Sequence, residues 1–123
     1  MPRGNRSDVT TNVGVVREMW LAHNEGRLDD MIATMHPQVE WEPWSRPGLS
    51  LYTGHDGIRR MQADVLVANG AYTILLDDVT ESESDVVTLK ARLVRGEDAA
   101  EIPLEVQIQM RDGLIYRVST LPS

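Results

Sequence analysis

The sequence contains no cysteine and no phenylalanine among its 123 residues. The absence of cysteine excludes disulfide bonds and metal sites built on thiolates. Without phenylalanine, the large apolar side chains of a core must come from six Met, three Trp, three Tyr and the aliphatic residues. A chain of this length is expected to form one domain around a single modest core.

Long apolar runs are also missing. No stretch approaches the roughly eighteen uninterrupted apolar residues that a membrane-spanning helix needs. The N-terminal stretch MPRGNRSDVTTN carries charge without the apolar segment of a secretory signal. The formal net charge of −7 disfavours nucleic acids and anionic membranes as partners, because both call for a basic surface. We therefore expect a cytoplasmic protein with a flexible N-terminus (residues 1–7) and one domain (residues 8–123).

The first third of the chain predicts two helices. A helix from Asp8 to Gly26, with Ser7 or Asp8 as N-cap, is predicted by an apolar stripe at helical spacing: Val9, Val13, Val16 and Trp20. A shorter helix follows, and its apolar face holds Leu28, Met31, Ile32 and Met35. His36 and Pro37 are expected to end it, because the residue before a proline is pushed out of the α region.

A strand and a third helix are predicted next. The strand runs from Val39 to Pro43 and is followed by a turn at Arg46-Pro47-Gly48. The segment Thr53-Gly54-His55-Asp56 opens the third helix and Asn69-Gly70 closes it. The apolar stripe of this helix holds Ile58, Met61, Val65 and Leu66.

The remainder predicts four strands, at residues 72–80, 85–95, 104–110 and 114–121, separated by turns at ESES, 96–98 and 111–113. In the segment 104–110, Val106, Ile108 and Met110 alternate with Glu105, Gln107 and Gln109, as in a strand with one buried face. The order α-α-β-α-β-β-β-β is typical of an α+β domain in which one curved sheet wraps around helices.

Three segments in order, EGRLDDMIATMHPQVEWEP, YTGHDGIRRM and RDGLIYRV, resemble the NTF2-like superfamily, in particular SnoaL-like proteins and relatives of ketosteroid isomerase. The resemblance spans the chain from about Val9 to Leu121. It implies a cone, in which a strongly curved, mostly antiparallel sheet surrounds three N-terminal helices and a deep apolar pocket opens at one end. It also implies a homodimer. Activities in the superfamily range from steroid isomerisation and polyketide cyclisation to epoxide hydrolysis, and many members only bind.

The stretch VEWEPW carries two carboxylates between its tryptophans. In the isomerase branch the general base is a carboxylate just before a proline on the first strand, and Glu42 before Pro43 matches that position. Beside Trp44 in a partly dry pocket, its pKa would be raised by desolvation. Strand alternation then requires Glu40 to face inward and Trp41 outward, unless a bulge near Pro43 intervenes. The alternative is that Glu42 is a solvated residue or the ion-pair partner of a nearby arginine.

The resemblance also implies hydrogen-bond donors for an enolate oxygen. The matching positions fall at Met19 and at Gln107 or Ile108, and Met19 and Ile108 cannot donate a hydrogen bond. Gln107 is expected on the opposite face of its strand. Because such donors commonly supply the largest catalytic effect, steroid isomerase activity itself is not expected. The Asp-Arg-Asp group of epoxide-hydrolysing relatives is not matched in VVTLKARLVRG either.

The leading hypothesis is a cofactor-free enzyme that isomerises or cyclises an apolar carbonyl compound, such as a polyketide or a steroid-like molecule. Glu42 would be the base, and Tyr52 or His23 its hydrogen-bonding partner. The predicted ligand-binding residues are Trp20, Met19, Met35, Trp44, Met61 and Ile108. No metal is expected, because no H-x-H or H-E-x-x-H spacing occurs. Two alternatives stay open: a non-catalytic binder of an apolar small ligand, and a dimerisation or association module that uses the open face of the sheet.

Overall fold

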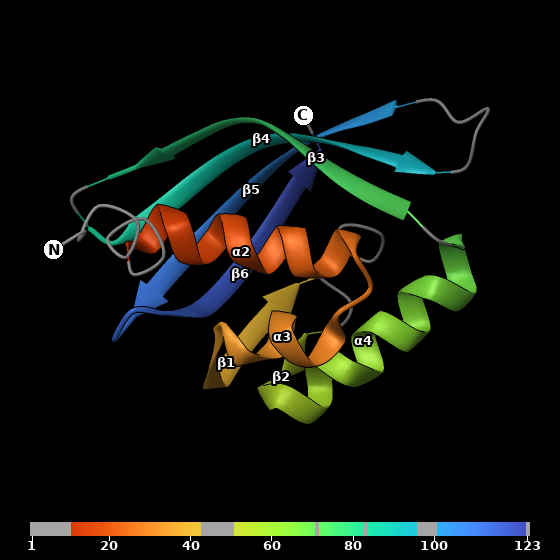
Figure 1. Ribbon diagram of the computed structural model, residues 1–123, viewed down its shortest axis with the longest axis horizontal. Coiled ribbons are helices and arrows are strands. Elements are labelled where there is room, and N and C mark those ends of the chain that lie inside the picture. The colour runs from red at the N-terminus through yellow and green to blue at the C-terminus, as the bar shows by residue number, and fades with distance from the viewer. Residues whose placement is uncertain (1–10, 43–50, 71, 83, 96–100, 123) are drawn as a thin grey trace, which may run out of the picture.

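The computed structural model describes residues 11–42, 51–70, 72–82, 84–95 and 101–122. Within these ranges three helices pack in a curved sheet of six strands (Figure 1). The helices are α2 (Asn12–Asn24), α3 (Leu28–Ala33) and α4 (Gly54–Asn69). The strands are β1 (Met35–Glu42), β2 (Tyr52–Thr53), β3 (Tyr72–Glu81), β4 (Val86–Arg95), β5 (Glu101–Arg111) and β6 (Leu114–Pro122). The predicted α+β class and order of elements are confirmed, with β2 as an addition.

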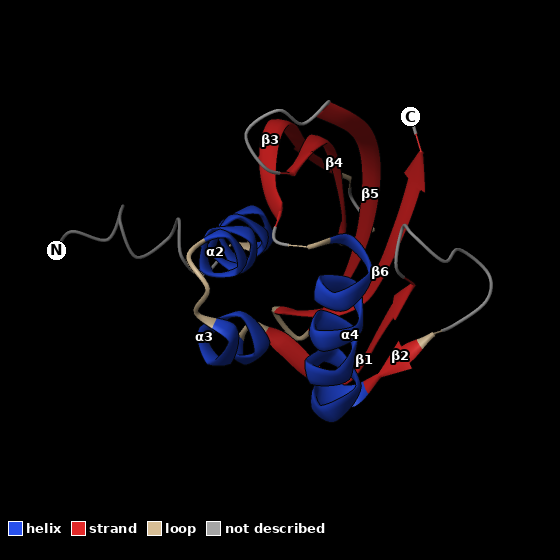
Figure 2. Cartoon of the chain, turned by 90° about the vertical axis from the view of Figure 1, so that its right-hand side faces the viewer, coloured by secondary structure: helices blue, strands red, loops and turns tan. Residues whose placement is uncertain are grey.

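The sheet has the strand order β2-β1-β6-β5-β4-β3. Only the β1–β6 pair in this sheet is parallel, and the other four pairs are antiparallel, as predicted. The register shifts between Leu76 and Asp78 in β3 and between Gln109 and Met110 in β5. Such irregularities bend a strand and increase its twist. Figure 2 shows the resulting curvature, with α2 and α4 on the concave side of the sheet.

Helix α2 has its N-cap at Thr11, whose side chain accepts a hydrogen bond of 3.0 Å from the backbone N–H of Gly14. This bond satisfies one of the free donors of the first turn. The predicted caps, Ser7 and Asp8, lie outside the described residues. The predicted end is confirmed, because Gly26 follows the helix with a φ of +75°, a conformation that glycine adopts without strain.

The prediction for the end of the second helix was wrong. Helix α3 stops at Ala33, and Met35 and His36 belong to strand β1. The hydroxyl of Thr34 donates to the carbonyl of Met31 (2.6 Å), which closes the last turn. The N–H of Ile115 in β6 donates to the carbonyl of Thr34 (3.0 Å), so strand pairing takes over directly after the helix. The apolar spacing at Met35 fits either element, and pairing with β6 decides between them.

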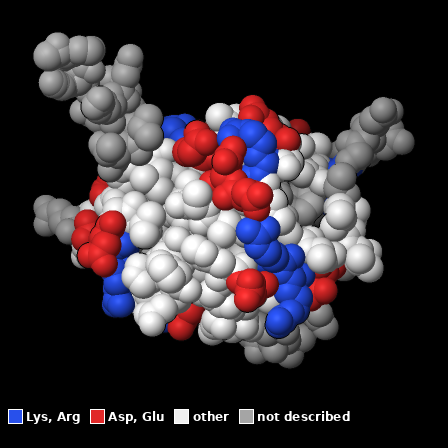
Figure 3. Space-filling view, turned by 60° about the horizontal axis from the view of Figure 1, so that its bottom comes forward, with Lys and Arg blue, Asp and Glu red and all other residues white. Residues whose placement is uncertain are grey.

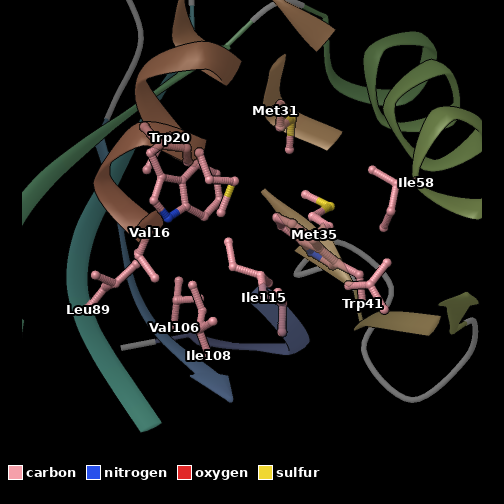
Figure 4. Close-up of a cluster of buried hydrophobic side chains, with 14 of the residues drawn as sticks. Val16, Trp20, Met31, Met35, Trp41, Ile58, Leu89, Val106, Ile108 and Ile115 are labelled. Atoms are coloured by element: carbon pink, nitrogen blue, oxygen red, sulfur yellow. The ribbon is translucent and has the colours of Figure 1, made fainter. Parts of the chain in front are cut away.

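The core lies between the helices and the concave face of the sheet (Figure 4). The alternation predicted for β5 is confirmed, because Val106, Ile108 and Met110 are buried while Gln107 and Gln109 are exposed. On α4, three of the four predicted apolar residues are buried: Ile58, Met61 and Val65. Leu66, the fourth, is 55% exposed and was wrongly included in the buried stripe.

Of three predicted turns, one lies within the described ranges. The turn between β5 and β6 is confirmed, with φ values of 56° at Asp112 and 76° at Gly113. Two successive residues with positive φ form the two-residue hairpin loop that matches the twist of paired strands. The predicted turns at residues 46–48 and 96–98 lie outside the described ranges.

Candidate functional site

A pocket of about 450 Å³ opens between the end of α2, the start of α3, helix α4 and the first residue of β3. Its apolar wall includes Leu28, Met31 and Leu66, and its polar wall includes His23 and Tyr72. A volume of this size falls within the range of small-molecule sites, which combine apolar walls with a few convergent polar groups. The pocket is therefore the candidate functional site.

A much smaller chamber of about 20 Å³ lies further inside, between the helices and the sheet. Its walls include Trp20, Trp41, Met61 and Thr120. Tyr72 lines both cavities. A chamber of this volume has room for about one water-sized group.

A row of aromatic side chains connects the chamber to the pocket. The ring centroids of Trp41 and Trp20 lie 5.7 Å apart, those of Trp20 and His23 5.5 Å, and those of His23 and Tyr72 4.9 Å. The first two contacts are edge-to-face, the arrangement that aromatic quadrupoles favour. Figure 4 shows Trp20 projecting from α2 into the apolar cluster. This packing holds the His23 ring between Trp20 and Tyr72.

His23 carries a buried nitrogen, Nε2, that has no hydrogen-bond partner within the described part of the chain. Burial lowers the pKa of His23 from 6.5 to about 4, so the imidazole is neutral at pH 7. Leaving a buried polar group unpaired costs about 1–3 kcal/mol, and such groups in native proteins call for an explanation. Nε2 is therefore a buried, unsatisfied polar atom on a residue that lines the pocket.

Tyr72 provides a second polar group beside His23. Burial raises the pKa of its hydroxyl from 10.0 to about 12, so the phenol keeps its proton at neutral pH. A neutral phenol can donate a hydrogen bond to an oxygen atom. The residues that line the pocket thus include a neutral imidazole, which can accept a proton, and a phenol, which can donate a hydrogen bond.

Asn24 fixes the end of α2 against β3. Its side-chain Nδ2 donates to the carbonyl of Ile74 (2.7 Å), and its Oδ1 accepts from the N–H of Ile74 (2.9 Å). Both bonds are partly buried. Since His23 precedes Asn24 and Tyr72 lies two residues before Ile74, this pair of bonds sets the distance between the two polar groups of the pocket.

Replacing Asn24 by alanine is expected to lower the free energy of unfolding by about 1–3 kcal/mol, because two partly buried hydrogen bonds are lost and the Ile74 backbone groups lose their partners. Urea unfolding followed by circular dichroism measures the change. Asn12→Ala is the matched control, because the bonds from Asn12 to Glu81 and Asp85 are exposed. Equal losses in the two variants would show that the Asn24 bonds have no special weight.

An ion pair links α3 to α4 at the pocket. Arg59, which lines the pocket, donates from Nη2 to Oδ1 of Asp29 at 2.8 Å. Both side chains are about half exposed or more, so the pair contributes little to stability. On the face drawn in Figure 3, basic side chains lie beside acidic ones next to a wide uncharged area. The charge of Arg59 itself is largely balanced by that of Asp29.

The structure separates the three predicted catalytic residues. His23 lines the pocket, whereas the hydroxyl of Tyr52 donates to Oδ2 of Asp64 (2.7 Å) and holds β2 against α4. Glu42 is half-buried and pairs with Ser119 of β6. Its neighbour Trp41 faces the core, so Glu42 lies on the other face of β1 and is not among the residues that line the two cavities in the described ranges. The catalytic roles themselves stay predictions.

The predicted ligand-binding residues also divide. Trp20 and Met61 line the inner chamber. Three others are buried in the core away from both cavities: Met19, Met35 and Ile108. Trp44 lies outside the described residues. Sequence reasoning missed Tyr72 and Thr120. The only signal for Thr120 was a polar residue at an inward position of its strand, two residues after the buried Val118.

The described residues contain no group of three or more His, Asp or Glu side chains close enough together to hold a metal ion. None of the helices in the same ranges is long and apolar enough to cross a membrane.

Comparison with known proteins agrees with this architecture. TerC, solved with polyporic acid, is 23% identical, with a TM-score of 0.76 and coverage of 91% of each chain. A protein proposed to be a polyketide cyclase, from Sinorhizobium meliloti, is 18% identical, with a TM-score of 0.75 over 87% of this chain and 93% of the other. Bal32a, from a soil-derived mobile gene cassette, is 16% identical, with a TM-score of 0.77 over 93% of this chain and 90% of the other.

These likenesses, together with matches to solved structures of NTF2-like proteins, show the NTF2-like fold. No curated protein matches the sequence. The family of the SnoaL-like domain matches residues 16–118, which is most of the chain and includes most of α2, all of α3 and α4, the first five strands and the first half of β6. The chain therefore belongs to the SnoaL-like domain family.

Proposed function

We propose that this protein binds a flat apolar carbonyl compound in the 450 Å³ pocket and moves a proton of that compound with His23 as general base. The observation that carries the proposal is that His23, a residue of the pocket wall, has a neutral imidazole whose Nε2 is buried and unpaired within the described ranges. The reaction would be an isomerisation or a cyclisation that proceeds through an enolate. It would need no cofactor, because its only steps are proton transfers and, in a cyclisation, addition of the enolate carbon to a carbonyl.

The two polar residues His23 and Tyr72 have separate roles in this reaction. Nε2 of His23 takes a proton from the carbon next to the carbonyl, and the electrons of that C–H bond form the enolate. The hydroxyl of Tyr72 donates a hydrogen bond to the enolate oxygen, a role for which the sequence suggested Tyr52 or His23 instead. Return of the proton from His23 to a different carbon gives an isomer. In a cyclisation, the enolate carbon instead attacks a second carbonyl, whose π electrons move to its oxygen, and the alkoxide so formed takes the proton back from His23. Such preorganised donors commonly supply a large part of the rate enhancement.

The low pKa of His23 is compatible with this role because the charge of the site changes during the reaction. In the free protein, burial lowers the pKa to about 4 and keeps Nε2 unprotonated and ready to accept. When the enolate forms, its negative charge lies beside the imidazolium. An opposite charge within a few ångströms favours the charged form of histidine, so the base strengthens as the proton moves.

Two structural neighbours are compatible with a ligand of this kind. Among the structural neighbours, one is proposed to be a polyketide cyclase and another was crystallised with polyporic acid. Their sequence identities of 18% and 23% support the shared fold alone. The choice of His23 and Tyr72 rests on the pocket of this chain.

The test is exchange of the acidic carbon-bound protons of β-tetralone, a flat bicyclic ketone, for deuterium, followed by NMR. Wild-type protein should accelerate the exchange, and His23→Phe should reduce the acceleration about a hundredfold, as expected for a general base. His36→Phe is the matched control, because His36 lies on β1 outside the pocket and contacts Tyr116 instead. Loss of exchange in Glu42→Gln, with His23→Phe fully active, would assign the base to Glu42 and overturn the proposal.

A non-catalytic binder is the second candidate, and one observation favours it. A histidine whose pKa is about 4 is a weak base in the free protein, and efficient general bases have pKa values nearer the working pH. In this case naphthol, which resembles the enol of β-tetralone, would quench tryptophan fluorescence in wild type and bind more weakly to His23→Phe. Exchange of the ketone protons would be absent from both proteins.

A further inference from the structure

One residue that lines the inner chamber carries a polar atom with no partner in the described part of the chain. Trp20 lines the chamber and is 5% exposed, and its indole Nε1 is buried without a hydrogen-bond partner in the described ranges. An indole nitrogen is a donor only, so an acceptor must complete it. Thr120, 4% exposed, lines the same chamber from β6. The other walls are apolar or aromatic, including Val65, Ile74 and Leu104.

We infer that the chamber receives one oxygen atom of the ligand, which accepts a hydrogen bond from the indole N–H of Trp20 beside the hydroxyl of Thr120. This inference rests on the proposed function, since the rest of the ligand occupies the outer pocket. It names the ligand class more closely: a flat apolar compound with at least two oxygen substituents. One oxygen lies beside His23 and Tyr72, and the other accepts the hydrogen bond from Trp20.

The size of the chamber sets what can enter. Its volume of about 20 Å³ holds about one water-sized group, such as a hydroxyl or a carbonyl oxygen. A methyl group of similar size would leave the donor of Trp20 unpaired, which is unfavourable in a buried site. The chamber thus selects a single polar atom rather than an apolar substituent.

The placement of the two unpaired nitrogens supports a single ligand. Trp20 and His23 are three residues apart on α2, so they lie on the same face of the helix. Their ring centroids are 5.5 Å apart, and Tyr72 lines both the pocket and the chamber. A fused two-ring compound in the outer pocket can therefore direct a second oxygen past Tyr72 toward Trp20.

The experiment compares naphthol, which has one oxygen, with the isomers of naphthalenediol, which have two. Isothermal titration calorimetry on the wild-type chain should find at least one diol that binds about tenfold more tightly than naphthol, as one additional well-placed hydrogen bond predicts. Trp20→Phe and Thr120→Val should each reduce this preference to less than about twofold. Thr88→Val is the matched control and should keep the tenfold preference, because Thr88 is half-buried on the other face of the sheet from Leu89.

A second readout covers the case in which Trp20→Phe does not fold. The indole N–H proton of Trp20, assigned by NMR through its proximity to the His23 ring, should shift downfield with the preferred diol and not with naphthol. An unshifted resonance, or a diol preference that survives in both Trp20→Phe and Thr120→Val, would overturn the inference and leave a bound water as the occupant of the chamber.

The inference and the proposed function can fail separately. If naphthol and every diol bind wild type equally, and His23→Phe weakens all of them, the chamber plays no part while the outer pocket remains a binding site. If no compound binds wild type, both proposals fall. Preference for a diol that disappears in Thr120→Val but not in Thr88→Val would support both.

Discussion

Replacing Trp20 by alanine is expected to lower the free energy of unfolding by about 3–5 kcal/mol, as large-to-small changes of buried aromatic residues do. Trp20 is 5% exposed and contacts the rings of both Trp41 and His23. Its removal deletes apolar contacts, leaves a cavity between α2 and the sheet, and ends two edge-to-face contacts. Urea unfolding, monitored by far-ultraviolet circular dichroism, measures the loss.

Leu21→Ala is the matched control on the same helix. Leu21 is 48% exposed, so its replacement should change the free energy of unfolding by less than about 0.5 kcal/mol. The unpaired Nε1 of Trp20 makes the native contribution smaller than burial area alone suggests, since deletion also removes an unsatisfied donor. A loss below about 1 kcal/mol for Trp20→Ala would therefore show that the chamber is a loosely packed region that collapses around the change.

The order of elements could be predicted from sequence because it depends on local periodicity. The stripe through Val16 and Trp20, and the strict alternation of Val106, Ile108 and Met110, each indicate one element with one buried face. The error at Met35 has the opposite cause. Its position fits the helical stripe, but pairing with Ile115 of β6, 80 residues later in the chain, places it in a strand. The local sequence pattern around Met35 does not indicate which distant strand pairs with it.

The candidate site was less predictable than the fold. The resemblance implied a base at Glu42, but the inward direction of Val39 and Trp41 places Glu42 on the other face of β1. Alternation on β1 requires either Val39 and Trp41 or Glu40 and Glu42 to face inward, and the sequence alone does not decide between the two sets. Tyr72 joined the site only through its contact with His23, across 49 residues of sequence. Such contacts arise from the tertiary arrangement of α2 and β3.

Lowering the pH from 7 to 4 is expected to remove roughly 3 kcal/mol of stability through His23 alone. Burial lowers the pKa of His23 in the folded protein to about 4, whereas the unfolded chain has the ordinary value of 6.5. Between these values the unfolded state binds a proton that the folded state does not, so the free energy of unfolding falls as pH falls. One pKa unit corresponds to about 1.4 kcal/mol, so the difference of about 2.5 units gives the stated magnitude.

His23→Phe isolates this effect, because every other titrating group is present in both proteins. At pH 7 the variant should be about as stable as wild type, since an apolar ring replaces a nitrogen that has no partner within the described chain. As the pH falls from 6.5 to 4, wild type should lose stability relative to the variant, and below pH 4 the difference should become constant. Urea unfolding at intervals of pH measures it. A stability difference that does not vary with pH would mean that water reaches Nε2 freely, in which case the pocket wall around His23 is wet and the imidazole is an ordinary titrating base.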